Sequence, residues 1–395
     1  MQPGDVVILS AVRTPIGNFG GGLKDLSAAQ LGAAAARAAL ERAGLAPDQV
    51  DEVIFGCARQ AGNGPNIARQ IAFHAGVPVE RPAFTVNKAC ASGLKAVTLG
   101  AQSIHCGENA LVLAGGTEQM SQIPYLLLKA RWGYRLGDDT LVDAMYRDGY
   151  FCPLAGMVMG ETAELLAERY AIGRDEQDRF ALESHQKAIA AWEQGYFAQE
   201  VVAVEAPGEK GTTGRIDRDE RPRADTTLEK LGRLKPAFKS EGTITAGNAS
   251  GITDGAAALV LTSAERAHEL GATPIARIVG YATAAVHPRE MGLGPVVATR
   301  RLLAQAGLTL GDFDLIEINE AFAAQVLAVE RELAWDVSRR NVHGGAVALG
   351  HPTGCSGARI LTTLLHALRT HDKTLGLATL CASGGPGMAV AVERL

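Results

Sequence analysis

The sequence predicts an α/β protein built from two similar halves. Short β-branched runs alternate with alanine-rich helical stretches along the 395 residues, and this alternation is typical of a mainly parallel sheet covered on both faces. AGLAPDQVDEVIFGCA, which starts at Ala43, resembles AGLTLGDFDLIEINEA, which starts at Ala306, an offset of 263 residues. Ser92 and Ser356, 264 residues apart, each precede an apolar helical run. Two matching offsets predict a structural repeat.

The expected elements follow this pattern in chain order. Apolar, β-branched runs predict strands at residues 6–10, 50–55, 110–116, 315–319 and 375–380. Runs with apolar residues at helical spacing predict helices at residues 28–44, 92–104, 299–307 and 358–368. A further long helix is expected at residues 175–195.

The middle third of the chain differs from both halves. Between about Met120 and Asn248 the sequence contains more charged and aromatic residues, and we interpret this stretch as an insertion carried on the first half. The predicted division is residues 1–120 with 249–272 for the first half, residues 121–248 for the insertion, and residues 273–395 for the second half.

Composition and charge exclude several classes of protein. Six cysteines are too few for a disulfide framework, and no apolar run is long enough to span a membrane. No targeting segment is recognisable at the start, so we expect a cytoplasmic protein with reduced thiols. A net charge of −5 gives no reason to expect nucleic acid or a membrane as a partner.

One segment is basic within this acidic chain. Residues 207–239 contain nine Lys or Arg and six Asp or Glu. Such a segment is either a solvated surface or a site for phosphate groups, and its residues alone favour the solvated surface.

Cys90 is the first candidate for catalysis. The run that follows it has apolar residues at helical spacing from Leu94 to Ile104, so Cys90 is expected at or near a helix N-terminus. Helix dipoles and free N–H groups stabilise a thiolate there, and they are expected to lower the thiol pKa. The alternative is a small buried residue at a helix start.

His351 is the candidate base. It stands between Gly350 and Pro352 in a glycine-rich stretch. Proline restricts the preceding residue to extended conformations, and glycine allows a close backbone approach. A histidine beside a cysteine can take its proton and leave a thiolate–imidazolium pair. A turn histidine with a purely structural hydrogen bond is the alternative.

Cys381 and Asn319 are further candidates. Cys381 ends the run LGLATL and enters SGGPG, where a thiol can shuttle a proton and backbone N–H groups can bind an oxyanion; a structural thiol is the alternative. Asn319 follows the strand DLIEI, and it either caps the next helix or holds a water that stabilises developing charge. The two CASG copies, at Cys90 and Cys381, lie 291 residues apart and are therefore not equivalent in the repeat.

Six stretches of the chain resemble the blocks of the thiolase family, in the same order and over essentially the whole length. They are VNKACASGLKA, AGGTEQMSQ, TAGNASGITDGAAA, EINEAFAAQ, NVHGGAVALGHPTGCSGAR and LCASGGPG. The family comprises acetyl-CoA C-acetyltransferases and 3-ketoacyl-CoA thiolases. The resemblance implies the thiolase fold, in which two βαβαβαββ halves form a layered αβαβα core with an inserted loop domain that binds coenzyme A.

The resemblance implies a role for each candidate. Cys90 matches the nucleophile that carries the acyl group as a thioester, and His351 matches the histidine that activates it. Asn319 matches the residue that, through a water, forms an oxyanion site with His351. Cys381 matches the group that removes or returns a proton at the α-carbon of acetyl-CoA. The backbone N–H groups of Cys90 and Ser383 would form a second oxyanion hole.

The resemblance also implies the partners. Coenzyme A, acetyl-CoA and acetoacetyl-CoA or another 3-ketoacyl-CoA are the expected substrates, and neither a metal nor a tightly bound cofactor is expected. Family members are dimers or tetramers, so we expect a homo-oligomer. The residues expected to contact coenzyme A or the acyl group are Arg223, Ser250, Phe238, Ala246, Met291 and Phe322. Because Arg223 is expected to contact coenzyme A, which carries phosphates, the resemblance favours a phosphate site over a solvated surface for the basic segment.

Three positions depart from the family pattern. Ser383 stands where the family usually has glycine, and a side chain is tolerated there if φ is negative. Val158 replaces a histidine of acetoacetyl-specific members, so a longer or branched acyl group is expected to fit. Cys355 replaces a small residue. The remaining cysteines are interpreted as structural: Cys57, Cys106, Cys152 and Cys355.

The main hypothesis is a ping-pong thiolase that cleaves acetoacetyl-CoA or a 3-ketoacyl-CoA and catalyses the reverse Claisen condensation through an acyl-cysteine. A degradative enzyme for medium or longer chains is the alternative within the family. The Asn319 and Cys381 blocks argue against a decarboxylating ketoacyl synthase. A papain-like hydrolase would not explain Cys381 or the repeat, and a non-catalytic acyl-CoA or lipid carrier would not explain all four catalytic side chains.

Overall fold

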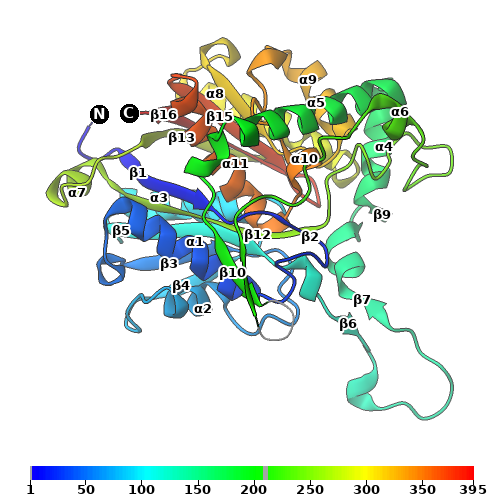
Figure 1. The fold of residues 1–395 in the computed structure, drawn as a ribbon, viewed down its shortest axis with the longest axis horizontal. Helices are drawn as coiled ribbons and strands as arrows, with labels where there is room; N and C mark the ends of the chain where they lie inside the picture. The colour runs from blue at the N-terminus through cyan, green and yellow to red at the C-terminus, as the bar shows by residue number, and fades with distance from the viewer. Residues whose placement is uncertain (1, 208–211) are drawn as a thin grey trace.

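The structure is a computed structural model that describes residues 2–207 and 212–395 (Figure 1). Its main sheet has the strand order β14, β15, β16, β13, β1, β12, β5, β3, β4, and β2 pairs with β12. The strands are β1 Val6–Arg13, β2 Gly17–Asn18, β3 Glu52–Gly56, β4 Ala83–Val86, β5 Leu111–Glu118, β12 Thr253–Ser263, β13 Ala276–Ala285, β14 Leu315–Ile318, β15 Leu375–Cys381 and β16 Pro386–Arg394. The helices are α1 Ala28–Ala43, α2 Ile67–His74, α3 Ser92–His105, α4 Met159–Arg169, α5 Arg174–Glu193, α6 Leu228–Gly232, α7 Ala264–Glu269, α8 Gly294–Ala306, α9 Ala323–Leu333, α10 Ala346–Leu349 and α11 Thr353–Thr370.

The predicted repeat is confirmed by the strand order. In the first half the order β1, β12, β5, β3, β4 matches β13, β16, β15, β14 in the second. A parallel bridge between Ile316 and Arg340 takes the place that β4 has beside β3. The halves meet where β1 and β13 pair antiparallel at Val7 and Ile8. Every expected strand and helix is present, although α11 begins at Thr353, before the expected residue 358.

The expectation of a mainly parallel sheet is wrong. Parallel pairing joins β3 to β4 and β5, and β14 to β15, whereas β12 and β16 run antiparallel to both of their neighbours. The short link from Cys381 to Pro386 joins β15 to β16, and so short a link permits only antiparallel pairing.

The helices complete a five-layer αβαβα arrangement. Helices α1 and α2 cover the first half, and α8 and α9 cover the second. Helices α3 and α11 form the central layer, where one apolar cluster joins them to strands of both halves. Gly93 and Gly357, again 264 residues apart, let these two helices approach closely, because a Cβ on Gly357 would lie 2.4 Å from the backbone nitrogen of Leu94. The N-terminal ends of α3 and α11 are thereby held together.

The predicted insertion contacts both halves. Helix α4 packs against α9 and α5 packs against α10, in the second half, while the hairpin of β10 Val204–Pro207 and β11 Thr213–Ile216 packs on the first. An arm bounded by β6 Tyr125–Leu126 and β7 Val142–Asp143 extends away from the core (Figure 1). A smaller hairpin joins β8 Phe151–Cys152 to β9 Met157–Val158. Glu209 and Lys210 of the basic segment lie outside the described residues. Within the described residues, no helix has the length and apolar character needed to cross a membrane.

Candidate active site

Cys90 lies in a tight turn between β4 and α3. Ala89 has a positive φ of 49°, which is uncommon for a residue with a side chain. The Ser92 hydroxyl fixes this turn, since it donates to the Ala89 carbonyl oxygen at 2.6 Å and accepts from the Lys88 N–H at 2.8 Å. Helix α3 begins at Ser92. Cys90 therefore has the predicted place, two residues before a helix.

The predicted lowering of the Cys90 pKa is wrong. Cys90 is half-buried as a residue, but its thiol is enclosed, and burial raises its pKa. The positive charge of Arg59 and the backbone N–H groups of Ser383 and of Cys90 itself act in the opposite direction without overcoming burial. Desolvation of a thiolate is large enough to exceed the favourable field of one helix end. The free thiol is therefore favoured in the structure.

His351 stands two residues before α11. Gly350 precedes it with a φ of 106°, where a Cβ would lie 2.4 Å from the Thr253 side chain. The imidazole Nδ1 lies 2.5 Å from the Ser356 hydroxyl oxygen, and Nε2 lies 3.4 Å from Asn319 Nδ2. The Ser356 hydroxyl donates to the Pro352 carbonyl oxygen at 3.0 Å, so Nδ1 carries the proton and Nε2 remains a free base.

Burial lowers the pKa of His351 to about 3, and the positive charges of Arg59 and Arg359 add to this effect. The imidazole is therefore neutral near pH 7. Neutral imidazole can accept a proton, which is the state that a base requires.

Asn319 faces His351 rather than a helix end. It is fully buried after β14, and its Oδ1 has no hydrogen-bond partner in the described part of the chain. Helix α9 has Phe322 at its N-cap position and no side-chain cap. The helix-cap alternative for Asn319 is therefore wrong.

Cys381 is the last residue of β15 and is buried. Burial raises the pKa of its thiol, and negative charge on Cys90 raises it further, so the two thiols lie within electrostatic reach of each other. The turn that follows has positive φ at Gly384 and Gly385 but not at Ser383. Because φ of Ser383 is not positive, a side chain is tolerated at this position. The backbone N–H of Ser383 lies within hydrogen-bond reach of the Cys90 thiol.

The structure thus brings the predicted catalytic residues together in two linked groups. Cys90, Cys381 and the Ser383 N–H form one, and His351 and Asn319 form the other. Among the hydrogen bonds of residues 2–207 and 212–395, none joins Cys90 directly to His351; Arg59 lies within electrostatic reach of both.

A cavity of about 620 Å³ leads to His351 and Thr353. Its walls include four of the residues expected to contact coenzyme A or the acyl group, namely Ser250, Phe238, Ala246 and Phe322, together with Val158. The rings of Phe238 and Phe322 meet edge to face at 5.9 Å. Met291 is buried in the neighbouring apolar cluster and does not line the cavity.

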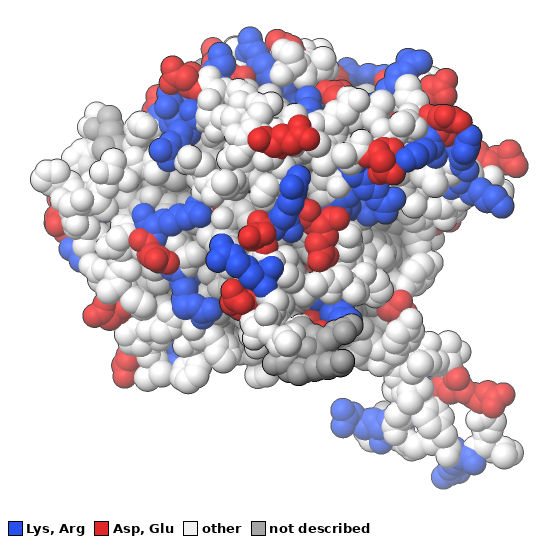
Figure 2. Space-filling view, in the orientation of Figure 1, with Lys and Arg blue, Asp and Glu red and all other residues white. Residues whose placement is uncertain are grey.

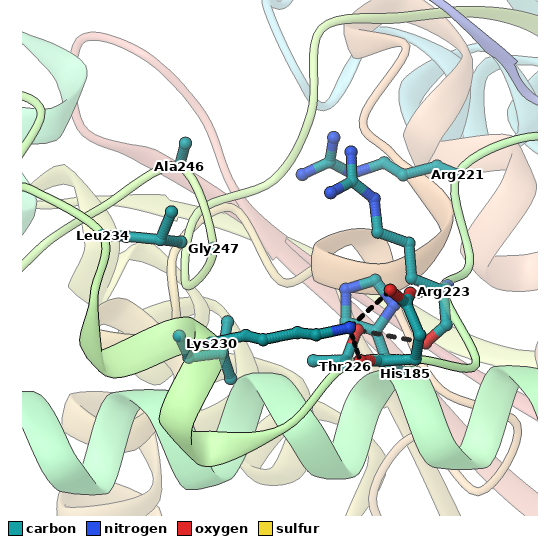
Figure 3. A pocket seen from close by; sticks show the side chains of 10 residues that line it. His185, Arg221, Arg223, Thr226, Lys230, Leu234, Ala246 and Gly247 are labelled. Atoms are coloured by element: carbon teal, nitrogen blue, oxygen red, sulfur yellow. Dashed lines mark hydrogen bonds and ion pairs between the residues drawn. The ribbon is translucent and has the colours of Figure 1, made fainter.

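A second cavity, of about 250 Å³, is lined by the basic segment. Arg221, Arg223 and Lys230 line it beside His185, and Lys230 Nζ is paired with the carboxylate of Asp225 at 2.6 Å (Figure 3). Burial lowers the pKa of His185 to about 4, and the two arginines add to this effect. Arg221 and Ala246 line both cavities, so the two are neighbours. Cations at this end favour an anionic group there.

Sequence reasoning missed several residues at the site. Ser356, used only to measure the repeat, is the partner of His351. Arg59, which acts on Cys90 and His351, carried no recognisable pattern. The same holds for Tyr150 and Arg221, which line the larger cavity, although Arg221 lies two residues from Arg223. The remaining cysteines divide by exposure, since Cys57, Cys152 and Cys355 are buried and Cys106 is exposed.

Comparison with known proteins gives a consistent result. The model of the thiolase N-terminal domain matches residues 6–265, and that of the thiolase C-terminal domain matches residues 272–394. The chain is 54% identical over 390 residues to an acetyl-CoA acetyltransferase of Pseudomonas aeruginosa, with 99% of each chain covered. It is 54% identical to an acetyl-CoA acetyltransferase of Escherichia coli K12, with 98% of this chain and 99% of the relative covered.

Solved structures agree with this result. An acetyl-CoA acetyltransferase of Bacillus anthracis superimposes with a TM-score of 0.97 at 46% identity and 99% coverage of both chains. Human mitochondrial 3-ketoacyl-CoA thiolase superimposes with a TM-score of 0.96 at 43% identity and full coverage of both. The fold and these matches define an enzyme of the acyltransferase class. The chain belongs to the thiolase family.

Proposed function

We propose that this enzyme cleaves acetoacetyl-CoA with coenzyme A to give two molecules of acetyl-CoA, and that it catalyses the reverse condensation. One arrangement carries the proposal. The Cys90 thiol lies beside the Ser383 N–H and within electrostatic reach of Cys381, and a neutral histidine stands at the end of a cavity that adjoins a basic one. The names of the relatives support acetyl-CoA as the substrate class.

In the first step Cys90 is the nucleophile. Nε2 of His351 takes the thiol proton, and the thiolate attacks the 3-keto carbon of the substrate. Burial keeps both groups neutral before substrate binds, so the ion pair forms only when the acyl group is present to use it. The N–H groups of Ser383 and Cys90 are placed to donate to an oxyanion.

The second chemical task belongs to Cys381. As the C2–C3 bond breaks, its thiol protonates C2 and acetyl-CoA leaves. The Cys381 thiolate then takes the thiol proton of coenzyme A, and the coenzyme A thiolate attacks the acyl-cysteine. The acyl thioester departs as His351 returns its proton to the Cys90 sulfur. In condensation Cys381 removes the proton from C2. Because burial raises its pKa, its thiolate is a strong base. Asn319 and His351 would hold the thioester oxygen, the asparagine through a water.

Coenzyme A would lie across the two cavities. Arg221, Arg223 and Lys230 suit its phosphates, and the apolar walls near Phe238 and Phe322 suit the pantetheine arm. We also propose the division of the chain into residues 1–120 with 249–272, residues 121–248 and residues 273–395, with the middle part supplying the basic groups. A cytoplasmic location is part of the proposal.

A homo-oligomer is proposed from the arm between β6 and β7. Its large apolar side chains are exposed, Leu136 fully and Trp132 by 88%. Lys, Arg, Asp and Glu are present on the arm, as they are over the rest of the visible face (Figure 2). Monomers rarely expose so large an apolar surface. Light scattering on the purified protein tests this; a monomer would contradict it.

The activity is tested by measuring coenzyme A-dependent cleavage of acetoacetyl-CoA beside a C8 3-ketoacyl-CoA. Acetoacetyl-CoA is the expected better substrate. A preference for the C8 substrate would favour the degradative alternative. Val158, in place of a histidine in the cavity wall, is compatible with a longer acyl group. Cys381→Ser is the control, with cleavage expected to fall by about 10²- to 10⁴-fold while Cys90 still forms an acyl adduct visible by mass spectrometry. Failure to cleave either substrate would refute the proposal.

A further inference from the structure

Arg59 is a buried cation next to the proposed catalytic residues. It follows β3, and only 4% of the residue is exposed. Its Nη1 donates to the Thr353 hydroxyl oxygen, and its guanidinium carbon lies 4.9 Å from the centroid of the Tyr150 ring. Its Nε has no partner within the described residues, and none of the ion pairs there includes Arg59. Burying a charge with so few partners is costly, so its retention needs a reason.

Arg59 is tied to the segment that carries His351. Thr353, the partner of its guanidinium, lies two residues after His351. The Glu118 carboxylate accepts from the Thr353 hydroxyl at 2.6 Å and from the Gly354 N–H at 2.7 Å. The Glu118 carboxylate also accepts from the backbone N–H of Arg59 at 3.0 Å. Arg59 and Glu118 therefore join the loop after β3 to the start of α11.

The charge of Arg59 acts on both reacting groups. It opposes the burial that raises the pKa of Cys90, and it adds to the burial that lowers the pKa of His351. Glu118 acts on Cys90 in the opposite direction, with less effect than Arg59. The other titratable groups near the thiol, Tyr150 and Cys381, are both held neutral because burial raises their pKa. Arg59 is thus the positive charge that acts most on the pKa of the thiol.

We propose that Arg59 is a positioning residue whose buried guanidinium, tied to the His351 segment through Thr353, stabilises the Cys90 thiolate when it forms. The inference rests on the proposed role of Cys90 as the nucleophile. Arg59 touches neither substrate nor the reacting sulfur in this account. Its charge favours the thiolate of Cys90 and disfavours the imidazolium of His351, so the proposed effect is on the thiolate and not on proton transfer as a whole.

The test is the pH dependence of Cys90 alkylation by iodoacetamide, in which the thiolate displaces iodide. A Cys106→Ser background removes the exposed thiol, and mass spectrometry of the peptide counts the Cys90 adduct. In Arg59→Gln the midpoint of the rate profile is expected about one pH unit higher than in the parent, with roughly tenfold slower alkylation at pH 7. Arg59→Lys, which keeps the charge, is expected to stay within about half a unit of the parent.

Two controls separate charge from structure. Arg81→Gln removes an equal charge from a partly exposed ion pair with Asp51 and is expected to leave the midpoint unchanged. Thr353→Val keeps the charge but cuts its tie to the His351 segment, so kcat is expected to fall while the midpoint moves little. If Arg59→Gln does not fold, Arg59→Met, of similar length, replaces it.

The outcomes distinguish this inference from the proposed function. A folded Arg59→Gln protein with an unchanged midpoint would overturn the inference, even if its activity were lost, because the residue would then be purely structural. A Cys90→Ser enzyme that retained thiolase activity would overturn the proposed function instead, whatever Arg59 does to alkylation.

Discussion

The N-terminal ends of α3 and α11 occupy equivalent places in the two halves but present different chemistry. Cys90 stands two residues before α3 and His351 two residues before α11. Each follows a residue with positive φ, Ala89 in one half and Gly350 in the other. Burial raises the pKa of the thiol and lowers that of the imidazole, so both groups rest in their neutral forms. The starts of two related helices thus hold the proposed proton donor and its proposed acceptor, although the offset of 264 residues pairs Cys90 with Gly354 and not with His351.

Removing the thiol is the most severe way to break this pairing. In Cys90→Ser the nucleophile is a far weaker acid, so thiolysis is expected to fall by about 10⁴-fold or more, with no acyl adduct on the protein by mass spectrometry. Cys106→Ser, at an exposed position, is the matched control and should retain full activity. Residual activity above about a hundredth of the parent would contradict the assignment.

Replacing the acceptor should cost less, because the thiol remains. In His351→Asn, cleavage of acetoacetyl-CoA is expected to fall by about 10³-fold, and steady-state kinetics should show the loss mainly in kcat. His74→Asn, which alters an exposed histidine, is expected to have no effect. Were His351→Asn to keep more than a tenth of the activity, another group would have to be the base.

Ser383 connects the two halves, since its backbone N–H, in the second half, lies at the Cys90 thiol of the first half. Ser383→Pro removes that N–H without requiring positive φ, and kcat is expected to fall by about 10²-fold. Ser383→Gly keeps the N–H, so the rate should change by less than about threefold, while the free energy of unfolding drops by about 0.5–1 kcal/mol. Equal rate losses in the two variants would show that the side chain, not the N–H, matters.

Acid should weaken the fold through its neutral histidines. The pKa of His351 is lowered to about 3, and those of His185 and His343 to about 4. The unfolded chain, with ordinary histidine pKa values near 6.5, therefore binds more protons below that pH, and stability is lost as pH falls from about 6.5 to 4.

Each of these histidines is expected to remove about 1 kcal/mol between pH 6.5 and 5.5. Urea unfolding at the two pH values measures the loss. His351→Asn should lose about 1 kcal/mol less than the parent over the same interval. A loss as large as the parent's would show that His351 is not buried as a neutral group.

The smallest expected effect comes from the support behind the imidazole. Ser356→Ala removes the hydrogen-bond partner of Nδ1, and kcat is expected to fall about tenfold with little change in KM. Thr362→Val is the matched control, since this buried threonine of α11 has a hydroxyl without a partner in the described structure. Comparable losses in both variants would point to a general disturbance of α11.

Local patterns were enough to predict much of the molecule. Five strands of the main sheet, five helices, the repeat and the neighbourhood of Cys90 with Ser383 and Cys381 follow from periodicity, offsets and the family blocks, whereas strands such as β12, β13 and β16 were not predicted. The direction of the Cys90 pKa did not follow, because burial of its thiol depends on the packing of both halves around the central layer. Ser356 and Arg59 were missed for a similar reason: each gains its role through a partner that is fixed only by the tertiary structure.

The antiparallel pairing was also beyond local patterns. A strand such as β12 has the same apolar run whether its neighbours are parallel or antiparallel, so only the order of strands in the folded sheet decides. Met291 shows the same limit on a smaller scale, since the family match gives its place in the chain but not whether its side chain reaches the cavity.

The place of β12 has a consequence for how the chain is made. Strand β1 ends at Arg13, but its partner β12 starts at Thr253, about 240 residues later. At a synthesis rate of about 5–20 residues per second, β1 waits roughly 12–50 s on the ribosome for that partner. Until then β5 also lacks its antiparallel neighbour. Nascent chains of this length should therefore expose unpaired apolar strand edges to chaperones for most of their translation.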